Sequence, residues 1–222
     1  TVSYSCDLSS INETIEISKK IKTMHKDIYC LMNNAGGIFM DFEVTKEGFE
    51  RTFALNHMSY YIITNILLEN ITSRIINIAS EAHRGAMITE DFKYPKKYNG
   101  WIQYKKSKLA NIYFTYYLDS MLDKADSQLT VNCLHPGVVN TNIANNNSNM
   151  IYKTISSLIK FFAISSKQGA VTPSYLATNS DVESISGSYF IKSRPVKSSK
   201  ISYDKGIAKD LWMLSAEIVR SI

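Results

Sequence analysis

Short apolar runs alternate with longer amphipathic stretches along most of the chain. Runs rich in Val, Ile, Leu and Cys predict strands at residues 1–6, 28–32, 74–79, 129–134 and 187–191. Helical spacing of apolar residues predicts helices at about 46–70, 101–122, 166–178 and 207–219. Ser10 and Glu13 have the spacing of a capping box, so we expect one more helix to begin there.

This alternation predicts an α/β fold with a parallel sheet covered on both faces. The 222 residues fit one domain, without repeat or linker. In such an open sheet, ligands bind beyond the carboxyl ends of the strands. Polar residues and glycines follow the predicted strands, and we expect them to line one crevice: Asp7, Asn34 to Gly36, Ser80 and Pro136-Gly137.

Composition excludes several classes of function. The net charge of +5 is modest and the lysines are spread out, so a nucleic-acid partner is not indicated. The histidines and cysteines lack metal-ligand spacing, which predicts no metal site, and a Gly-x-Ser-x-Gly elbow of serine hydrolases is absent.

The cysteines and the apolar runs bear on localisation. Cys6, Cys30 and Cys133 lie in strand-like runs and read as reduced core thiols. No apolar run reaches the roughly 18 residues that span a bilayer, and no signal peptide opens the sequence. We therefore expect an intracellular, reducing compartment: the cytoplasm, or the cytoplasmic side of an internal membrane.

Tyr104 and Lys108 are candidates for acid/base chemistry. They lie four residues apart in a predicted helix, so the phenol and the ammonium project from one face. A nearby cation favours the phenolate and lowers the pKa of a tyrosine, which suits proton transfer to or from a substrate oxygen. With 14 tyrosines, about one Tyr-x-x-x-Lys match is expected by chance, so the pair needs companions.

Those companions are present, and with them the sequence resembles the short-chain dehydrogenase/reductases over nearly its whole length. In chain order they are Cys6-Asp7-Leu8, Asn33-Asn34-Ala35-Gly36, Ala54-Leu55-Asn56-His57, Asn77-Ile78-Ala79-Ser80, Tyr104-Lys105-Lys106-Ser107-Lys108 and Pro136-Gly137-Val138-Val139-Asn140-Thr141. Other pieces resemble the retinol dehydrogenase branch: Ser80-Glu81-Ala82-His83, Leu134-His135-Pro136-Gly137 and Ser186-Gly187-Ser188-Tyr189-Phe190.

The resemblance implies a Rossmann-type doubly wound sheet and a set of catalytic residues. Tyr104 would be the acid/base, and Lys108 would lower its pKa and bind the nicotinamide ribose. Ser80 would donate a hydrogen bond to the substrate oxygen, and Asn56 would hold a water for proton relay. The implied activity is NADP-dependent interconversion of an apolar alcohol, such as retinol, and its aldehyde or ketone.

The resemblance also implies where the cofactor binds. Asp7 and Leu8 would meet the adenine, and Asn34, Ala35 and Gly36 the adenosine side. Tyr104 and Lys108 would meet the nicotinamide ribose, and Pro136, Gly137, Val139 and Thr141 would surround the nicotinamide end. The branch favours NADP, and NAD is not excluded. A homodimer through the helices of Asn56 and Tyr104 is a family expectation.

Two surface features have more than one interpretation. Residues 138–165, with apolar positions from Met150 to Phe162, fall where the family places a substrate lid. Core packing is the alternative, and these residues could also touch a membrane surface. The lysines between Lys93 and Lys106 favour a solvated face over a phosphate or membrane contact.

A glycine-rich turn after the first strand, which a dinucleotide site requires, is not found in the sequence. Residues 1–6 match the third strand of the family, so we expect the first strand, phosphate loop and second strand to be missing, as in a fragment or a degenerate copy. Residues 28–32 should then form an open sheet edge, with poor solubility or weak cofactor binding. The alternative function is a non-catalytic binding or interaction module that keeps the scaffold.

Overall fold

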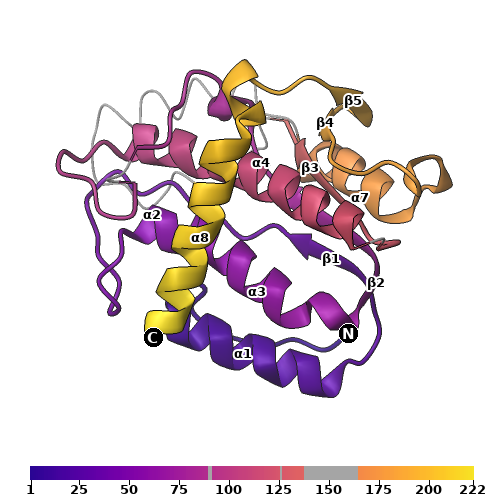
Figure 1. The fold of residues 1–222 in the computed structure, drawn as a ribbon, viewed down its shortest axis with the longest axis horizontal. Coiled ribbons are helices and arrows are strands. Elements are labelled where there is room, and N and C mark those ends of the chain that lie inside the picture. Colours follow the sequence, from indigo (N-terminus) through magenta and orange to yellow (C-terminus); the bar gives the residue numbers. More distant parts are fainter. Residues whose placement is uncertain (90–91, 126, 138–164) are drawn as a thin grey trace.

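The computed structural model describes residues 1–89, 92–125, 127–137 and 165–222 (Figure 1). Its sheet has the strand order β1-β2-β3-β4-β5. β1 to β4 run parallel, and β5 is antiparallel to β4. The strands are β1 Ile28–Asn33, β2 Ile71–Ile78, β3 Thr130–His135, β4 Tyr189–Ile191 and β5 Arg194–Val196. The predicted α/β fold of the Rossmann type is confirmed.

Helices cover both faces of this sheet. The longer ones are α1 Ile11–Met24, α3 Ser59–Leu67, α4 Gly100–Lys124, α7 Val171–Thr178 and α8 Lys205–Ser221. The shorter elements are α2 Arg51–Phe53, the π-helical turn η1 Ala54–Met58, α6 Ser166–Gly169 and the 3-10 turns η2 Leu68–Asn70, η3 Glu81–His83, η5 Ser180–Val182 and η6 Lys200–Tyr203. In Figure 1, α8 crosses α3 and α4, while α7 lies to the side, next to β3 and β4.

Two apolar layers result from the alternation of strand residues between the faces. Ile75 and Val131, paired across β2 and β3, face the larger layer with residues of α1, α3, α4 and α8. Ile76, Ile78 and Leu134 face the smaller layer, which includes Leu176 of α7. Near-continuous apolar strands are explained by this burial on both sides.

β1 is an edge strand, because among the described strands it pairs with β2 alone. This agrees with the open edge expected for residues 28–32. Tyr29 on this strand is 56% exposed. The prediction of a strand at residues 1–6 is wrong: this segment has no strand pairing, and Tyr4 instead hydrogen-bonds the His25 ring. A strand needs a neighbour for its backbone groups, and apolar pattern alone cannot supply one.

Local turns account for the other differences. The predicted helix at 46–70 begins at Arg51, because Val44 and Glu50 form a bridge around Gly48, whose φ is +86°. β5 was not predicted, because the β4–β5 turn places Lys192 and Ser193 at positive φ without the usual glycine or asparagine.

The start of α1 forms half of the predicted capping box. Ser10 Oγ accepts a hydrogen bond from Glu13 N at 3.3 Å, as expected. The Glu13 carboxylate, however, binds Asp7 N at 2.9 Å, and no bond from it to Ser10 N is recorded.

Candidate active site

Lys108 lies beneath the carboxyl end of β2, buried in α4. Its Nζ donates a hydrogen bond to the Ile78 carbonyl at 3.1 Å and lies 5.7 Å from the centre of the Tyr104 ring. The Tyr60 ring is 5.9 Å away on another side. No carboxylate pairs with Lys108 among the described residues. Burial therefore lowers the pKa of this amine to about 8.

Tyr104 is half-buried one turn before Lys108 and stacks on Trp101, with ring centres 5.6 Å apart. The helix begins where the sequence provides a cap: Asn99 Oδ1 accepts a hydrogen bond from Ile102 N at 3.0 Å. Phenol and ammonium thus share one face of α4, as their spacing predicts.

Asn56 ties the loop after β1 to α4. It sits in the π-helical turn, and its Nδ2 donates to Gly37 O and to Ser107 Oγ, both at 2.9 Å. Its Oδ1 accepts from Gly37 N at 2.8 Å. Both amide hydrogens are therefore committed to protein groups, and only Oδ1 has capacity for a water.

Gly36 packs closely against these side chains. A Cβ added there would lie 3.2 Å from Asn56 Oδ1 and 3.4 Å from Lys108 Nζ. A side chain at this position would crowd the Asn56 amide and the Lys108 amine, which explains the glycine.

A buried polar ladder fixes the strand ends against α4. Asn33 Nδ2 donates to Asn77 Oδ1 at 2.8 Å, and Asn77 Nδ2 donates to Thr115 Oγ1 at 3.0 Å. Asn111 Nδ2 reaches Ile78 O at 3.2 Å. Ser107, Asn111 and Thr115 were not predicted as site residues, although steps of three, four and four residues from Tyr104 place them on one face of the helix.

Ser80 follows β2 and caps η3, where its Oγ accepts from Ala82 N at 3.2 Å. Its backbone is held by His83: Ser199 N donates to Nε2 at 3.0 Å, so Nδ1 carries the proton and donates to Ser80 O at 2.6 Å. Burial lowers the pKa of His83. In the described part of the chain the Ser80 hydroxyl proton has no recorded acceptor, so it is available to donate.

The expected adenine-side residues are engaged locally. Asp7 accepts hydrogen bonds from the hydroxyl and backbone N of Ser9 at 2.7 and 2.9 Å, which lower the pKa of its carboxyl. Leu8 O accepts from Thr14 Oγ1 at 3.3 Å. Asn34 and Ala35 directly precede Gly36 at the end of β1, with Asn34 exposed.

The nicotinamide-side candidates fall at the limit of the described structure. Pro136 and Gly137 follow β3, with Gly137 at φ +94°. Val139 and Thr141, and the predicted lid apart from Ser165, lie outside the described residues. The structure thus brings Gly36, Asn56, Tyr104 and Lys108 together, and records no contact between this group and Asp7 or Leu8.

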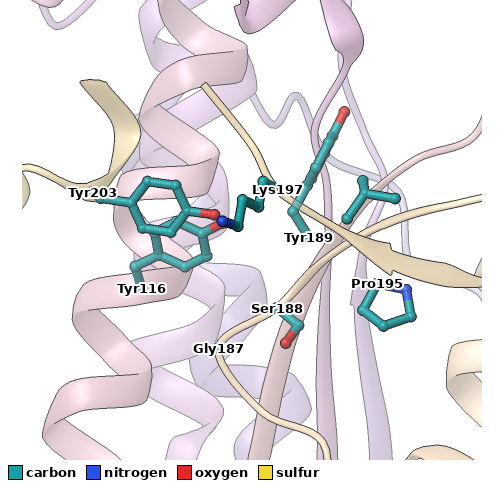
Figure 2. A pocket seen from close by; sticks show the side chains of 8 residues that line it. Tyr116, Gly187, Ser188, Tyr189, Pro195, Lys197 and Tyr203 are labelled. Carbon is teal, nitrogen blue, oxygen red and sulfur yellow. The ribbon is translucent and has the colours of Figure 1, made fainter. Parts of the chain in front are cut away.

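A separate pocket of about 270 Å³ opens between the second half of α4, β5 and η6 (Figure 2). Tyr116, Tyr189, Lys197 and Tyr203 are among the residues lining it, and neither Tyr104 nor Lys108 is. Tyr116 and Tyr203 stack there at 5.2 Å. We therefore treat it as distinct from the Tyr104 site.

The described ranges hold no candidate for a metal site or a membrane-spanning helix. Within them, no three His, Cys, Asp or Glu side chains gather as metal ligands would. Of the helices they contain, none is both long and apolar enough to cross a bilayer.

Comparison with known proteins places this geometry in a family. A family model described as short chain dehydrogenase matches residues 1–151. Retinol dehydrogenase 14 of Mus musculus is 32% identical over 96% of this chain and 65% of its own length. A crystal structure of a protein from Mycobacterium paratuberculosis covers 98% of this chain and 75% of its own at a TM-score of 0.77, with 27% identity. The crystal structure of the angucycline C-6 ketoreductase LanV with bound NADP covers 83% and 70%, with a TM-score of 0.59 and 25% identity.

The chain belongs to the short-chain dehydrogenase family, in its retinol dehydrogenase-like branch. The family comprises NAD(P)-dependent oxidoreductases of alcohols and carbonyl compounds, so the predicted enzyme class is confirmed. The chain spans about two thirds of the length of the mouse relative.

Proposed function

We propose that this chain carries the acid/base half of an NADP-dependent oxidoreductase that interconverts an apolar alcohol and its aldehyde or ketone. One observation carries the proposal: the Lys108 ammonium lies 5.7 Å from the Tyr104 ring centre without a carboxylate partner in the described residues. At pH 7 an amine with a pKa of about 8 is mostly protonated, so its charge favours the Tyr104 phenolate.

The proton steps follow from this arrangement. During reduction, Tyr104 donates its phenolic proton to the substrate oxygen, and during oxidation it accepts that proton. Ser80 donates a hydrogen bond to the same oxygen and stabilises its growing negative charge. Lys108 stabilises the phenolate, and a water on Asn56 Oδ1 returns the proton. NADP supplies or accepts the hydride.

Several features support binding of the nicotinamide ribose here. The Lys108 amine uses one of its three protons on Ile78 O, and a side chain at position 36 would crowd it, whereas Gly36 does not. The ketoreductase with bound NADP favours NADP over NAD. No glycine-rich phosphate turn is found in residues 1–222, so we expect them to bind the cofactor weakly by themselves.

The substrate class rests on the relatives and on one apolar stretch of the sequence. Retinol dehydrogenase 14 is named for a long apolar alcohol. The segment from Met150 to Phe162, outside the described residues, offers apolar side chains in sequence. The family homodimer and the intracellular compartment stay predictions.

The test is reduction of all-trans-retinal with NADPH, and separately with NADH, by the full-length protein. We expect retinol to form with faster turnover on NADPH. A protein that forms no alcohol from retinal or from other long-chain aldehydes would instead support the non-catalytic binding module.

A further inference from the structure

A cluster of exposed apolar side chains lies beside the Tyr104 site. Phe42, Tyr94, Trp101 and Ile102 are all large, and Tyr94, Trp101 and Ile102 are 54%, 43% and 50% exposed. Single exposed apolar residues are normal on protein surfaces, whereas a contiguous group marks an interaction site. With the neighbouring exposed Lys96 and Lys97, we call these residues the amphiphilic patch.

Direct contacts join the two loops that carry this patch. The Phe42 ring packs edge-on against Tyr94 at 5.6 Å and lies 5.3 Å from Tyr98. Tyr98 Oη donates to Phe39 O at 2.6 Å. The loops before α2 and before α4 therefore form one surface, at the end of the molecule beside α2 (Figure 1).

Gly100 brings the start of α4 against the same surface. A Cβ there would lie 2.0 Å from Phe39 O, so only glycine permits this approach. Trp101 and Ile102 follow immediately and stay exposed.

The charge of this region indicates the partner. Residues 89–106 contain five lysines and two acidic residues. Lys96 and Lys97 are exposed and form no ion pair within the described chain. On the other loop Glu43 pairs with Arg51, which leaves Asp41 as an exposed acid. Cationic groups around exposed aromatic rings complement a negatively charged surface.

We propose that the amphiphilic patch docks on the surface of an anionic lipid bilayer. Tryptophan and tyrosine favour the headgroup region, and lysines extend their ammonium groups to the lipid phosphates. The cores of protein interfaces, by contrast, are depleted in lysine. The strength of such binding depends on the apolar area that is buried and on the electrostatic attraction to anionic lipids.

Docking in this orientation would bring an apolar substrate to the proposed active site. Only this part of the inference rests on the proposed function. Trp101 stacks directly on Tyr104, so the lipid-facing surface adjoins the acid/base residue. An apolar alcohol or aldehyde dissolved in the bilayer would then reach Tyr104 without crossing water.

The experiment is flotation of the protein with vesicles of phosphatidylcholine alone or with added phosphatidylserine. We expect binding to the anionic vesicles, weakened about 10- to 30-fold by the double substitution Lys96→Ser/Lys97→Ser, at about fivefold per lysine. The matched control Lys205→Ser/Lys209→Ser removes the same charge from exposed positions on α8 and should bind as the wild type does. Equal losses in both double variants, or no vesicle binding, would overturn the proposal.

Tryptophan fluorescence gives a second measurement, because Trp101 and Trp212 are the only tryptophans. Brominated lipids should quench Trp101 in a Trp212→Phe variant and leave Trp212 unquenched in a Trp101→Phe variant. Quenching of Trp212 alone would refute the orientation. Neither measurement uses turnover or cofactor, so an inactive protein would leave this inference intact.

Discussion

Replacing Lys108 by methionine should make the protein more stable while abolishing turnover. The ammonium is buried and has no carboxylate partner in the described residues. Methionine has a similar length and carries no charge to desolvate. The Ile78 carbonyl would keep a partner, because Asn111 Nδ2 also donates to it at 3.2 Å. The substitution therefore does not leave the Ile78 carbonyl unpaired.

The lowered pKa sets the magnitude. A value of about 8 in the folded protein, against 10.5 for the free amine, corresponds to about 3 kcal/mol. Below pH 8 this cost is fully present, because both states hold the proton and only the folded state buries the charged amine. It disappears as pH rises from 8 to 10.5. Since the variant also loses packing and one hydrogen bond, we expect a net gain of about 1–3 kcal/mol at pH 7.

Urea unfolding at several pH values measures this difference. The difference in unfolding free energy between Lys108→Met and wild type should be largest at pH 7 and should decrease by about 3 kcal/mol toward pH 10.5. Comparing the two proteins at each pH cancels the titration of other groups. A variant that is less stable than wild type at pH 7, with a gap independent of pH, would refute the account of Lys108 as an unpaired buried cation.

Further predictions concern three other buried groups. His57 donates through Nε2 to Ser215 Oγ, and burial lowers its pKa to about 3. The stability that neutral His57 provides above pH 6.5 is lost as pH falls toward 3. The unfolding free energy that the protein loses between pH 7.5 and 4.5 should therefore be smaller in His57→Gln, by about 2.5 kcal/mol. Equal losses of unfolding free energy in urea unfolding of the two proteins would contradict this. The buried Tyr60 hydroxyl has no hydrogen-bond partner among the described residues, so Tyr60→Phe should raise the unfolding free energy by about 1 kcal/mol. Tyr113→Phe, which removes a 2.8 Å bond to Ile201 O, should lower it by a similar amount, and the opposite order would show that Tyr60 is bonded in solution.

Much of the fold could be predicted from sequence, because burial on both faces gives continuous apolar strands. β2, β3 and α4 were found within a few residues of their bounds. Residues 1–6 have the same apolar character without strand pairing, because pairing depends on a neighbour elsewhere in the chain. The β4–β5 hairpin was missed because its turn uses Lys192 and Ser193.

The candidate site could also be predicted only in part. Tyr104 and Lys108 could be paired from helix geometry alone, since a spacing of four fixes a shared face. The bonds of Asn56 to Gly37 and Ser107 could not, because they join segments 19 and 51 residues apart. The lack of a charge partner for Lys108 likewise depends on which side chains the fold brings near it.

The most direct test of the central claim is the turnover of Tyr104→Phe in the full-length protein, with retinal and NADPH. Removing the only transferable proton from Tyr104 should lower kcat by about 100-fold or more, with an unchanged circular dichroism spectrum. Tyr175→Phe, on α7 across the sheet, should retain wild-type kcat. A Tyr104→Phe protein that turns over like the wild type would contradict the assignment of Tyr104 as the acid/base.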